Sequence, residues 1–119
     1  MAIQVKEAYT RAVLTAAVVS VVTNNAAVNT PLAIRIDKCT VANPKTFATT
    51  YYLTVYIVPS GGTADSTNIV IDALPILSGG VYGCPEIVNQ VLGPGTTVQW
   101  KADVATKLNG GISTTTFAG

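Results

Sequence analysis

The sequence has no histidine and few charged residues. Of its 119 residues, 11% are Asp, Glu, Lys or Arg, which is about half the usual share. Without histidine, the chain lacks the side chain that most often serves as a general base or as a metal ligand. Seven Lys and Arg against six Asp and Glu give a net charge of +1, whereas a nucleic-acid binder needs a basic stripe. We therefore expect no nucleic-acid partner and no bound metal ion.

Groups that carry catalysis are also scarce. A serine nucleophile would need lysine as its base, and no Ser is paired with a Lys in the sequence. The Gly-rich segments 60–62 and 78–80 neither open a helix nor precede a lysine, so they are turns rather than phosphate-binding loops. Asp65 offers a single carboxylate toward a calcium site, which is weak support. The six carboxylates are expected on outer faces and in loops, with no two spaced as an acid–base pair: Glu7, Asp37, Asp65, Asp72, Glu86 and Asp103. The sequence therefore predicts a non-enzymatic protein without a cofactor.

The two cysteines, Cys39 and Cys84, are too few for a four-thiolate zinc site or a disulfide framework. We expect buried thiols that act as small hydrophobic side chains. A single Cys39–Cys84 disulfide in a secreted domain is the alternative.

Apolar residues are abundant but are divided into short runs. Hydrophobic residues make up 49% of the chain and the mean hydropathy is +0.44, which excludes a disordered chain. The run 12–22 is too short for a membrane span, which needs about 20 residues, and Glu7 does not fit the basic start of a signal peptide. We therefore predict no membrane association. Valines favour a buried strand over 12–22, and a helix is the alternative.

The remaining pattern predicts strands. The sequence has 17 Thr and 16 Val, both strong strand formers. Along 47–58, the odd positions from Phe47 to Ile57 are expected to face the core, and the even positions alternate Thr and Tyr. Along 32–37, Leu32, Ile34 and Ile36 alternate with more polar residues, and the NPK segment 43–45 is expected to join these two strands as a hairpin.

Further short strands are expected over 68–73, 87–92, 98–103 and 112–117, with Trp100 in the core. Seven or eight strands with turn signals every 8–12 residues predict an all-β fold, an antiparallel β-sandwich or jelly-roll-like domain. Residues 1–10 are expected to form a short N-terminal arm, and residues 11–119 a single domain.

A small domain has a large surface for its volume, and this chain has few charged residues to place on that surface. We therefore expect part of the surface to be in contact with other chains. The amphipathic N-terminal segment, with Ile3, Val5 and Tyr9, is expected to pair with the sheet edge of a neighbouring subunit. Tyr52 and Tyr56 lie opposite the core-facing positions of their strand, which indicates an interface. A second buried sheet face is the alternative for these two tyrosines.

Several segments resemble the small virion proteins of tailed phages and prophages. The matching residues are Cys39–Asn43, then Tyr56–Ala64 (YIVPSGGTA), and later the segment 84–103 (CPEIVNQVLGPGTTVQWKAD). Two positions depart from the pattern, since Thr96 replaces the usual Asp and Trp100 stands at a small or aliphatic position. The likeness covers most of residues 20–118, and its motifs are turn and strand signals that carry no chemistry.

The resemblance implies a non-enzymatic virion protein without a cofactor, assembled in the host cytoplasm. A capsid decoration (cement) protein that binds the major capsid protein is the first hypothesis, and a neck, tail or head-fibre-base protein is the alternative. A homo-oligomer is expected, and a trimer is favoured because closed three-fold symmetry would leave no exposed sheet edge. The hypothesis from another class is a carbohydrate- or receptor-binding module, with Tyr52, Tyr56 and Asn68 as its only candidates.

Overall fold

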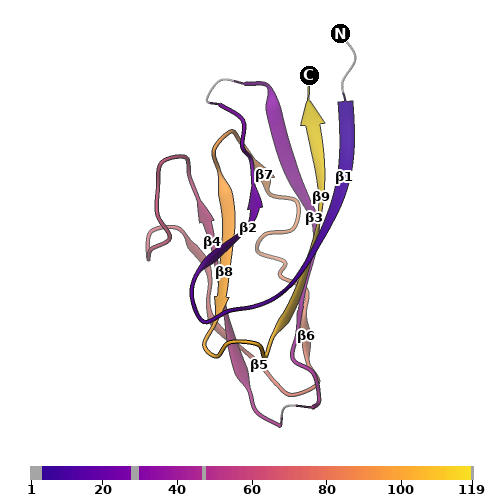
Figure 1. Cartoon of the computed structure of the whole chain (residues 1–119), viewed down its shortest axis with the longest axis vertical. Coiled ribbons are helices and arrows are strands. Elements are labelled where there is room, and N and C mark those ends of the chain that lie inside the picture. Colours follow the sequence, from indigo (N-terminus) through magenta and orange to yellow (C-terminus); the bar gives the residue numbers. More distant parts are fainter. Residues whose placement is uncertain (1–3, 28–29, 47, 119) are drawn as a thin grey trace.

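Two antiparallel sheets pack face to face in the computed structural model, which describes residues 4–27, 30–46 and 48–118 (Figure 1). Within these residues there is no helix, and the nine strands are β1 (Gln4–Val13), β2 (Val19–Thr23), β3 (Leu32–Ala42), β4 (Tyr51–Val58), β5 (Ile69–Ile76), β6 (Val81–Tyr82), β7 (Val91–Leu92), β8 (Thr97–Ala102) and β9 (Asn109–Ala118). The predicted all-β sandwich is confirmed. The strand number exceeds the expected seven or eight because β6 lies where no strand was expected. The strand predicted over 87–92 is wrong for most of its length, since residues 85–89 form turns and only β7 is a strand.

The strand order is that of a jelly roll. One sheet has the order β1-β9-β3-β6, with β7 also paired to β3, and the other has the order β2-β8-β4-β5. Strands β1 to β4 thus pair with β9, β8, β6 and β5 in reverse order, as if one long ribbon were folded back and rolled up. This arrangement leaves β1 at one edge of its sheet (Figure 1).

The core lies between the sheets and follows the alternation of each strand. In β8, Val98, Trp100 and Ala102 are buried, while the residues between them are partly exposed. Trp100 is fully buried against β9, where a Cβ at Gly110 would lie 2.8 Å from the indole Cζ3. Trp100 is therefore a core residue, as predicted. Cys39 and Cys84 are both buried free thiols, which confirms that prediction as well.

Two buried asparagines secure the crossings between the sheets. The Asn24 amide donates to the carbonyls of Leu32 and Leu92, at 3.1 and 3.0 Å. The Asn43 amide donates to the carbonyls of Thr49 and Ile76, both at 2.8 Å. Each amide donates to backbone carbonyls that the sheets leave unpaired. A buried carbonyl without a hydrogen bond would lower the stability of the fold.

The predicted hairpin between residues 32–37 and 47–58 is wrong. β3 pairs with β9 over the whole of Leu32–Ala42, whereas β4 pairs with β8 and β5 in the other sheet. Between the end of β3 at Ala42 and the start of β4 at Tyr51 the chain passes from one sheet to the other, so the turn at residues 45–46 does not join a hairpin. The direction of this segment is fixed by the buried Asn43 amide, a long-range contact that local turn signals do not reveal.

The apolar run 12–22 is likewise divided between two strands. β1 ends at Val13, Leu14 is fully buried at the crossing between the sheets, and β2 begins at Val19. Neither a single strand nor a helix covers the run. Residues 4–13 do not project as an arm, because β1 pairs with β9 along its entire length.

The strand predicted over 47–58 begins only at Tyr51, and Phe47 lies outside the described residues. Leu53 and Val55 face the core as expected. Tyr56 is also buried, although it lies on the face of β4 opposite Leu53 and Val55, because β4 keeps a continuous register with β8. The register shifts beside it come from extra residues in β5.

Candidate interaction surface

The most exposed strand of the molecule is β1. Every residue from Val5 to Arg11 is exposed, and its outer edge pairs with no strand among residues 4–27, 30–46 and 48–118. Val5, Tyr9 and Val13 are 58%, 59% and 51% exposed. Residues an even number of positions apart in a strand point to the same face, so these three side chains share one face of β1 with Glu7 and Arg11 between them. We call the three apolar side chains the β1 stripe.

Tyr9, in the middle of the β1 stripe, rests against a glycine of the neighbouring strand. A Cβ at Gly111 would lie 3.0 Å from the Tyr9 Cζ, so a larger residue at 111 would displace the ring. Open hollows of about 420 and 400 Å³ are lined in part by Tyr9. The first is lined also by Arg11, Thr40, Ala42, Asn109, Gly110 and Gly111, and the second by Glu7, Ala8, Asp37, Ser113 and Thr114. The surface beside β1 is therefore uneven, and the Tyr9 ring projects from it between the two hollows.

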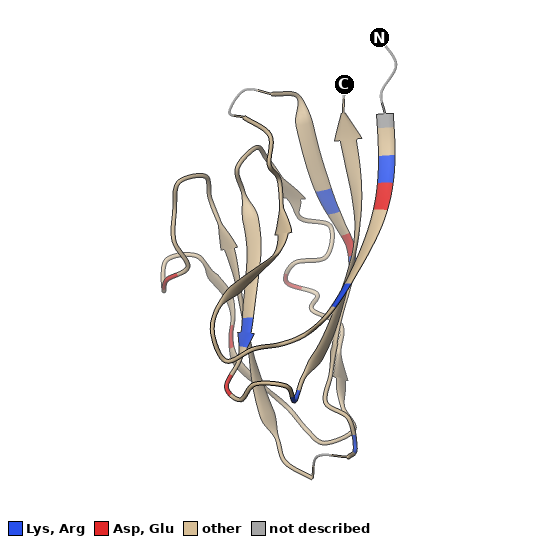
Figure 2. Ribbon diagram, viewed as in Figure 1, with Lys and Arg blue, Asp and Glu red and all other residues tan. Residues whose placement is uncertain are grey.

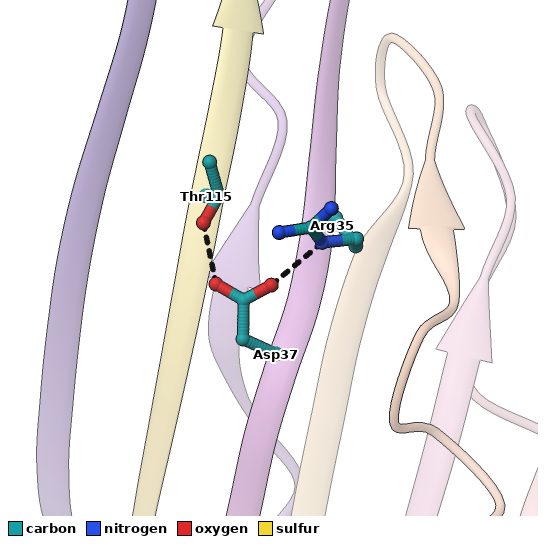
Figure 3. Close-up of polar contacts among 3 residues, drawn as sticks. All are labelled: Arg35, Asp37 and Thr115. Carbon is teal, nitrogen blue, oxygen red and sulfur yellow. Dashed lines mark hydrogen bonds and ion pairs between the residues drawn. The ribbon is translucent and has the colours of Figure 1, made fainter.

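A polar cluster stands further across the same sheet, on β3 and β9 (Figure 3). Arg35 Nε donates to Asp37 Oδ1 at 2.6 Å, and the Thr115 hydroxyl donates to Asp37 Oδ2. The hydrogen bonds from Thr115 and Arg35 hold the pKa of Asp37 below its ordinary value. Arg35 also lies over the Phe117 ring, 5.2 Å from its centroid. These groups satisfy one another, so they stabilise the sheet surface and leave no free catalytic group.

Charges are sparse over the whole fold (Figure 2). On β1 they alternate in sign, with Lys6 and Glu7 adjacent and Arg11 further along. An ion pair joins Arg35 to Asp37. Over the described residues, the Lys and Arg residues do not line up into a continuous basic surface that would suit a nucleic-acid phosphate backbone.

The residues predicted for the interface do not all meet. Val5 and Tyr9 share one face of β1, whereas Tyr52 is 41% exposed on β4, in the other sheet. The Tyr52 backbone N–H donates to Asp103 at 2.9 Å. Tyr56 differs from the expectation of an exposed aromatic, because it is only 8% exposed and unavailable to a partner. Ile3 lies outside the described residues.

The geometry gives no support to a sugar-binding row. Tyr56 is buried, so Tyr52 stands without a second aromatic platform on its strand. The Asn68 amide donates to the Thr63 carbonyl at 2.8 Å and accepts from the Asp65 N–H at 3.1 Å, so it is used within its own loop.

Neither a metal-binding cluster nor a membrane-spanning helix is found in the part of the chain that the structure describes. No three His, Cys, Asp or Glu side chains gather there into a metal-binding group. The Asp65 carboxylate accepts hydrogen bonds from the Thr67 hydroxyl and N–H, which lower its pKa and tie it into its turn. No helix that would be long and apolar enough to cross a membrane occurs over the described ranges.

Sequence reasoning missed three features of this surface. Val13 had been assigned to a buried strand, although its spacing from Val5 and Tyr9 places it in the β1 stripe. The contact of Tyr9 with Gly111 joins residues at opposite ends of the chain, so no local pattern reveals it. The same holds for the hydrogen bond between Asp37 and Thr115.

Comparison with known proteins identifies relatives by fold alone. No family model matches the chain, and no curated protein matches its sequence. A chain of the Bacillus endospore appendages, which form a family of disulfide-linked pili, has a TM-score of 0.55 and is 10% identical, covering 98% of this chain and 87% of that one. A chain of infectious bursal disease virus strain Gx has a TM-score of 0.45 and 14% identity over 99% of this chain and 32% of its own. A chain of the T13 particle of the same virus has a TM-score of 0.43 and 11% identity over 98% and 31%.

At these identities a likeness describes the fold only, and the pilus chain is the comparison that supports it. This chain spans most of the pilus chain but less than a third of each viral chain. The chain therefore has the β-sandwich fold of a protein that forms pili, and its role has to be argued from its own surface.

Proposed function

We propose that the chain is a non-enzymatic structural subunit of a tailed-phage particle, a capsid decoration protein that β1 holds against a neighbouring chain. The phage assignment is supported by the sequence resemblance at Cys39–Asn43, Tyr56–Ala64 and residues 84–103. The structural role is supported by the likeness in fold to a chain of disulfide-linked pili and by the long open edge of β1. In such a role many modest contacts add up, because each copy binds at several junctions of a shell.

The observation that carries the proposal is the unprotected edge of β1. Long exposed edge strands are normally shortened, bent or broken, because they pair with other chains. The other edges of this molecule follow that rule. β6 and β7 have two residues each, β2 has five residues with a register shift, and β5 contains Pro75 and a positive φ at Ala73. β1 has ten residues with no such interruption, and it carries the β1 stripe.

The particle itself provides the test. A cryo-electron microscopy map of intact virions that contain the chain gives its copy number and its position. A capsid decoration protein is present in a multiple of sixty copies, on the outer shell and in contact with the major capsid protein. Six or twelve copies at the portal or tail would contradict the decoration role and favour the neck or tail alternative. Absence from purified virions would contradict the proposal altogether.

A further inference from the structure

The residues of β1 are complementary to a second copy of the same strand. In an antiparallel pair related by a two-fold axis perpendicular to the sheet, two residues directly opposite each other point their side chains to the same side of the sheet. Odd positions of one copy therefore lie opposite odd positions of the other. An axis beside Tyr9 places Val5 opposite Val13, Glu7 opposite Arg11, and Tyr9 opposite Tyr9. Each of these pairs occurs twice across the axis, except the central one. On the face that carries the odd positions, apolar residues thereby face apolar residues and each carboxylate faces a guanidinium. On the other face, Lys6 lies opposite Ala12 and Ala8 opposite Thr10, so the match belongs to the odd positions.

Neighbouring registers lose this match. Moving the axis to Ala8 would place Glu7 opposite Tyr9 and Val5 opposite Arg11. Moving it to Thr10 would place Tyr9 opposite Arg11 and Glu7 opposite Val13. A charge would then face an apolar or aromatic side chain at each of these positions, without a partner of opposite sign. The pattern of β1 therefore specifies both the occupant of its edge and the register.

We propose that β1 pairs with β1 of a second copy in this register, which joins the two β1-β9-β3 sheets into one continuous sheet. The edge is accessible, since residues Val5 to Arg11 are exposed on both faces. The inference rests on the surface named in the proposed function and gives it a partner. It also replaces the trimer expected from the sequence with a two-fold contact, because the complementarity of β1 is that of a self-pairing strand.

Charge exchange tests the contact. Glu7→Arg places two guanidinium groups opposite each other twice in the dimer, and Arg11→Glu does the same with carboxylates. Each single variant is expected to raise the dissociation constant at least tenfold in sedimentation equilibrium, and the double variant Glu7→Arg/Arg11→Glu is expected to restore it. All three are compared by circular dichroism and thermal melting, so that a folding defect is recognised. Singles that dimerise like the wild type, or a double variant no better than the singles, would overturn the pairing.

A cross-link tests the register. In Tyr9→Cys the new thiols of two copies face each other at the axis, and oxidised glutathione is expected to give a covalent dimer. Val5→Cys alone faces Val13 and is the matched control, which is expected to stay monomeric on a non-reducing gel. A Val5→Cys chain mixed with a Val13→Cys chain is expected to cross-link. Dimers from Val5→Cys alone, or none from Tyr9→Cys, would overturn the register. If virions contain the chain while β1 does not self-pair, the proposed function stands and this inference falls.

A separate observation concerns the two cysteines. Val41 and Ala42 of β3 pair with Tyr82 and Val81 of β6. Cys84 lies two residues beyond the end of β6 with a φ of 45°, and Cys39 stands at the corresponding position of β3 when the register is counted on. Both cysteines are fully buried. Facing residues of antiparallel strands have Cα atoms about 4.5–5.5 Å apart, a separation that a disulfide can span. The Cys84 thiol donates to the Tyr82 carbonyl at 3.8 Å, and the neighbouring Cys39 thiol helps to raise the pKa of Cys84, as expected for two thiols that lie close together.

We infer that Cys39 and Cys84 form an intramolecular disulfide when a small-molecule disulfide serves as the oxidant. One thiolate attacks oxidised glutathione and releases the first reduced glutathione. The second thiolate attacks the mixed disulfide and releases the second, so the two thiol protons end on the two reduced glutathiones. Hydrogen bonding to Cys39 and burial raise the pKa of the Cys84 thiol, which keeps the reactive thiolate scarce in the folded chain. Exchange is therefore expected to be fast during folding and slow afterwards.

Refolding provides the test. The chain is refolded from urea with oxidised glutathione, then unfolded again in urea near pH 7 with excess N-ethylmaleimide, and its intact mass is measured. A monomer lighter by about two daltons and without a maleimide label is expected, and Cys84→Ser is the control that cannot close the bond. Two maleimide labels on the refolded monomer, or a covalent dimer in place of the internal bond, would overturn the inference.

Discussion

Gly110 and Gly111 are adjacent on β9. Each accommodates one aromatic ring, and the two rings lie on opposite faces of the sheet. Trp100 covers Gly110 in the core, and Tyr9 covers Gly111 on the outside. Adjacent residues of a strand point to opposite faces, so two glycines in succession let both rings approach the backbone. One pair of residues thus links the core to the candidate interaction surface.

Gly110→Ala is expected to lower the free energy of unfolding by about 2 kcal/mol, because overpacking at a core contact typically costs 1–3 kcal/mol. The new Cβ would lie 2.8 Å from Trp100 Cζ3. Urea denaturation followed by Trp fluorescence measures the change. Gly93→Ala is the matched control, since nothing lies within 4 Å of its Cβ position, and it is expected to change stability by less than about 0.5 kcal/mol. Equal effects of the two substitutions would contradict the packing described for Trp100.

Asp37 makes the stability of the sandwich depend on pH. Hydrogen bonds from Thr115 and Arg35 lower its pKa from the ordinary 3.8, so the folded state binds the proton less well than the unfolded state. The stability that Asp37 contributes is therefore present above pH 3.8 and is lost as the pH falls through the lowered pKa.

Asp37→Asn is expected to flatten the acid limb of the stability profile, measured by urea unfolding at a series of pH values below neutrality. Asp72→Asn removes an exposed carboxylate of β5 and is the control. If both variants keep the acid dependence of the wild type, then the hydrogen bonds of Figure 3 do not contribute to stability.

At the scale of elements, the loop between β8 and β9 contains a strained residue. Thr106 has a φ of 63°, a left-handed conformation that is unfavourable for a β-branched side chain. Its backbone N–H donates to the Leu14 carbonyl at 3.1 Å, which fixes the loop against the crossing between β1 and β2.

Thr106→Gly is expected to raise the free energy of unfolding by about 0.5–1 kcal/mol, because glycine adopts positive φ without strain. Ala105→Gly, at the preceding residue, has no such strain to relieve and is expected to lower stability through the entropy of the unfolded chain. Thermal and urea unfolding of the two variants check the contrast. A destabilised Thr106→Gly would mean that this conformation is not costly.

The elements differ in how far the sequence predicts them. The alternation in β3 and β8 predicts both the strands and their buried faces, because side-chain direction in a strand depends on local pattern. The partners of these strands are not predicted, since β3 pairs with β9 and the residues that decide this lie more than sixty positions away. For the same reason the run 12–22 appears continuous in sequence, although Leu14 packs at the crossing between two sheets. Of the candidate surface, the alternation of the N-terminal segment indicates Val5 and Tyr9, whereas the burial of Tyr56 on the face opposite Leu53 and Val55 does not follow from the alternation of β4.

At the scale of the whole molecule, the few charged residues are scattered over several strands and loops and do not gather in one element (Figure 2). Edge strands other than β1 are short or interrupted, so the molecule offers one long edge for pairing. A charge-poor surface and one open edge together are the basis of the proposed contact with a neighbouring chain.

The central claim is that β1 holds the chain in a particle. The most direct measurement is the number of copies per purified virion, determined by quantitative mass spectrometry for Val5→Lys/Tyr9→Lys and for the matched control Leu77→Lys/Val81→Lys. All four side chains are exposed apolar residues, at 58%, 59%, 68% and 67%, so both variants are expected to fold. The account predicts that the β1 variant is lost from virions at least tenfold while the control keeps the wild-type copy number. A β1 variant incorporated as fully as the control would contradict it.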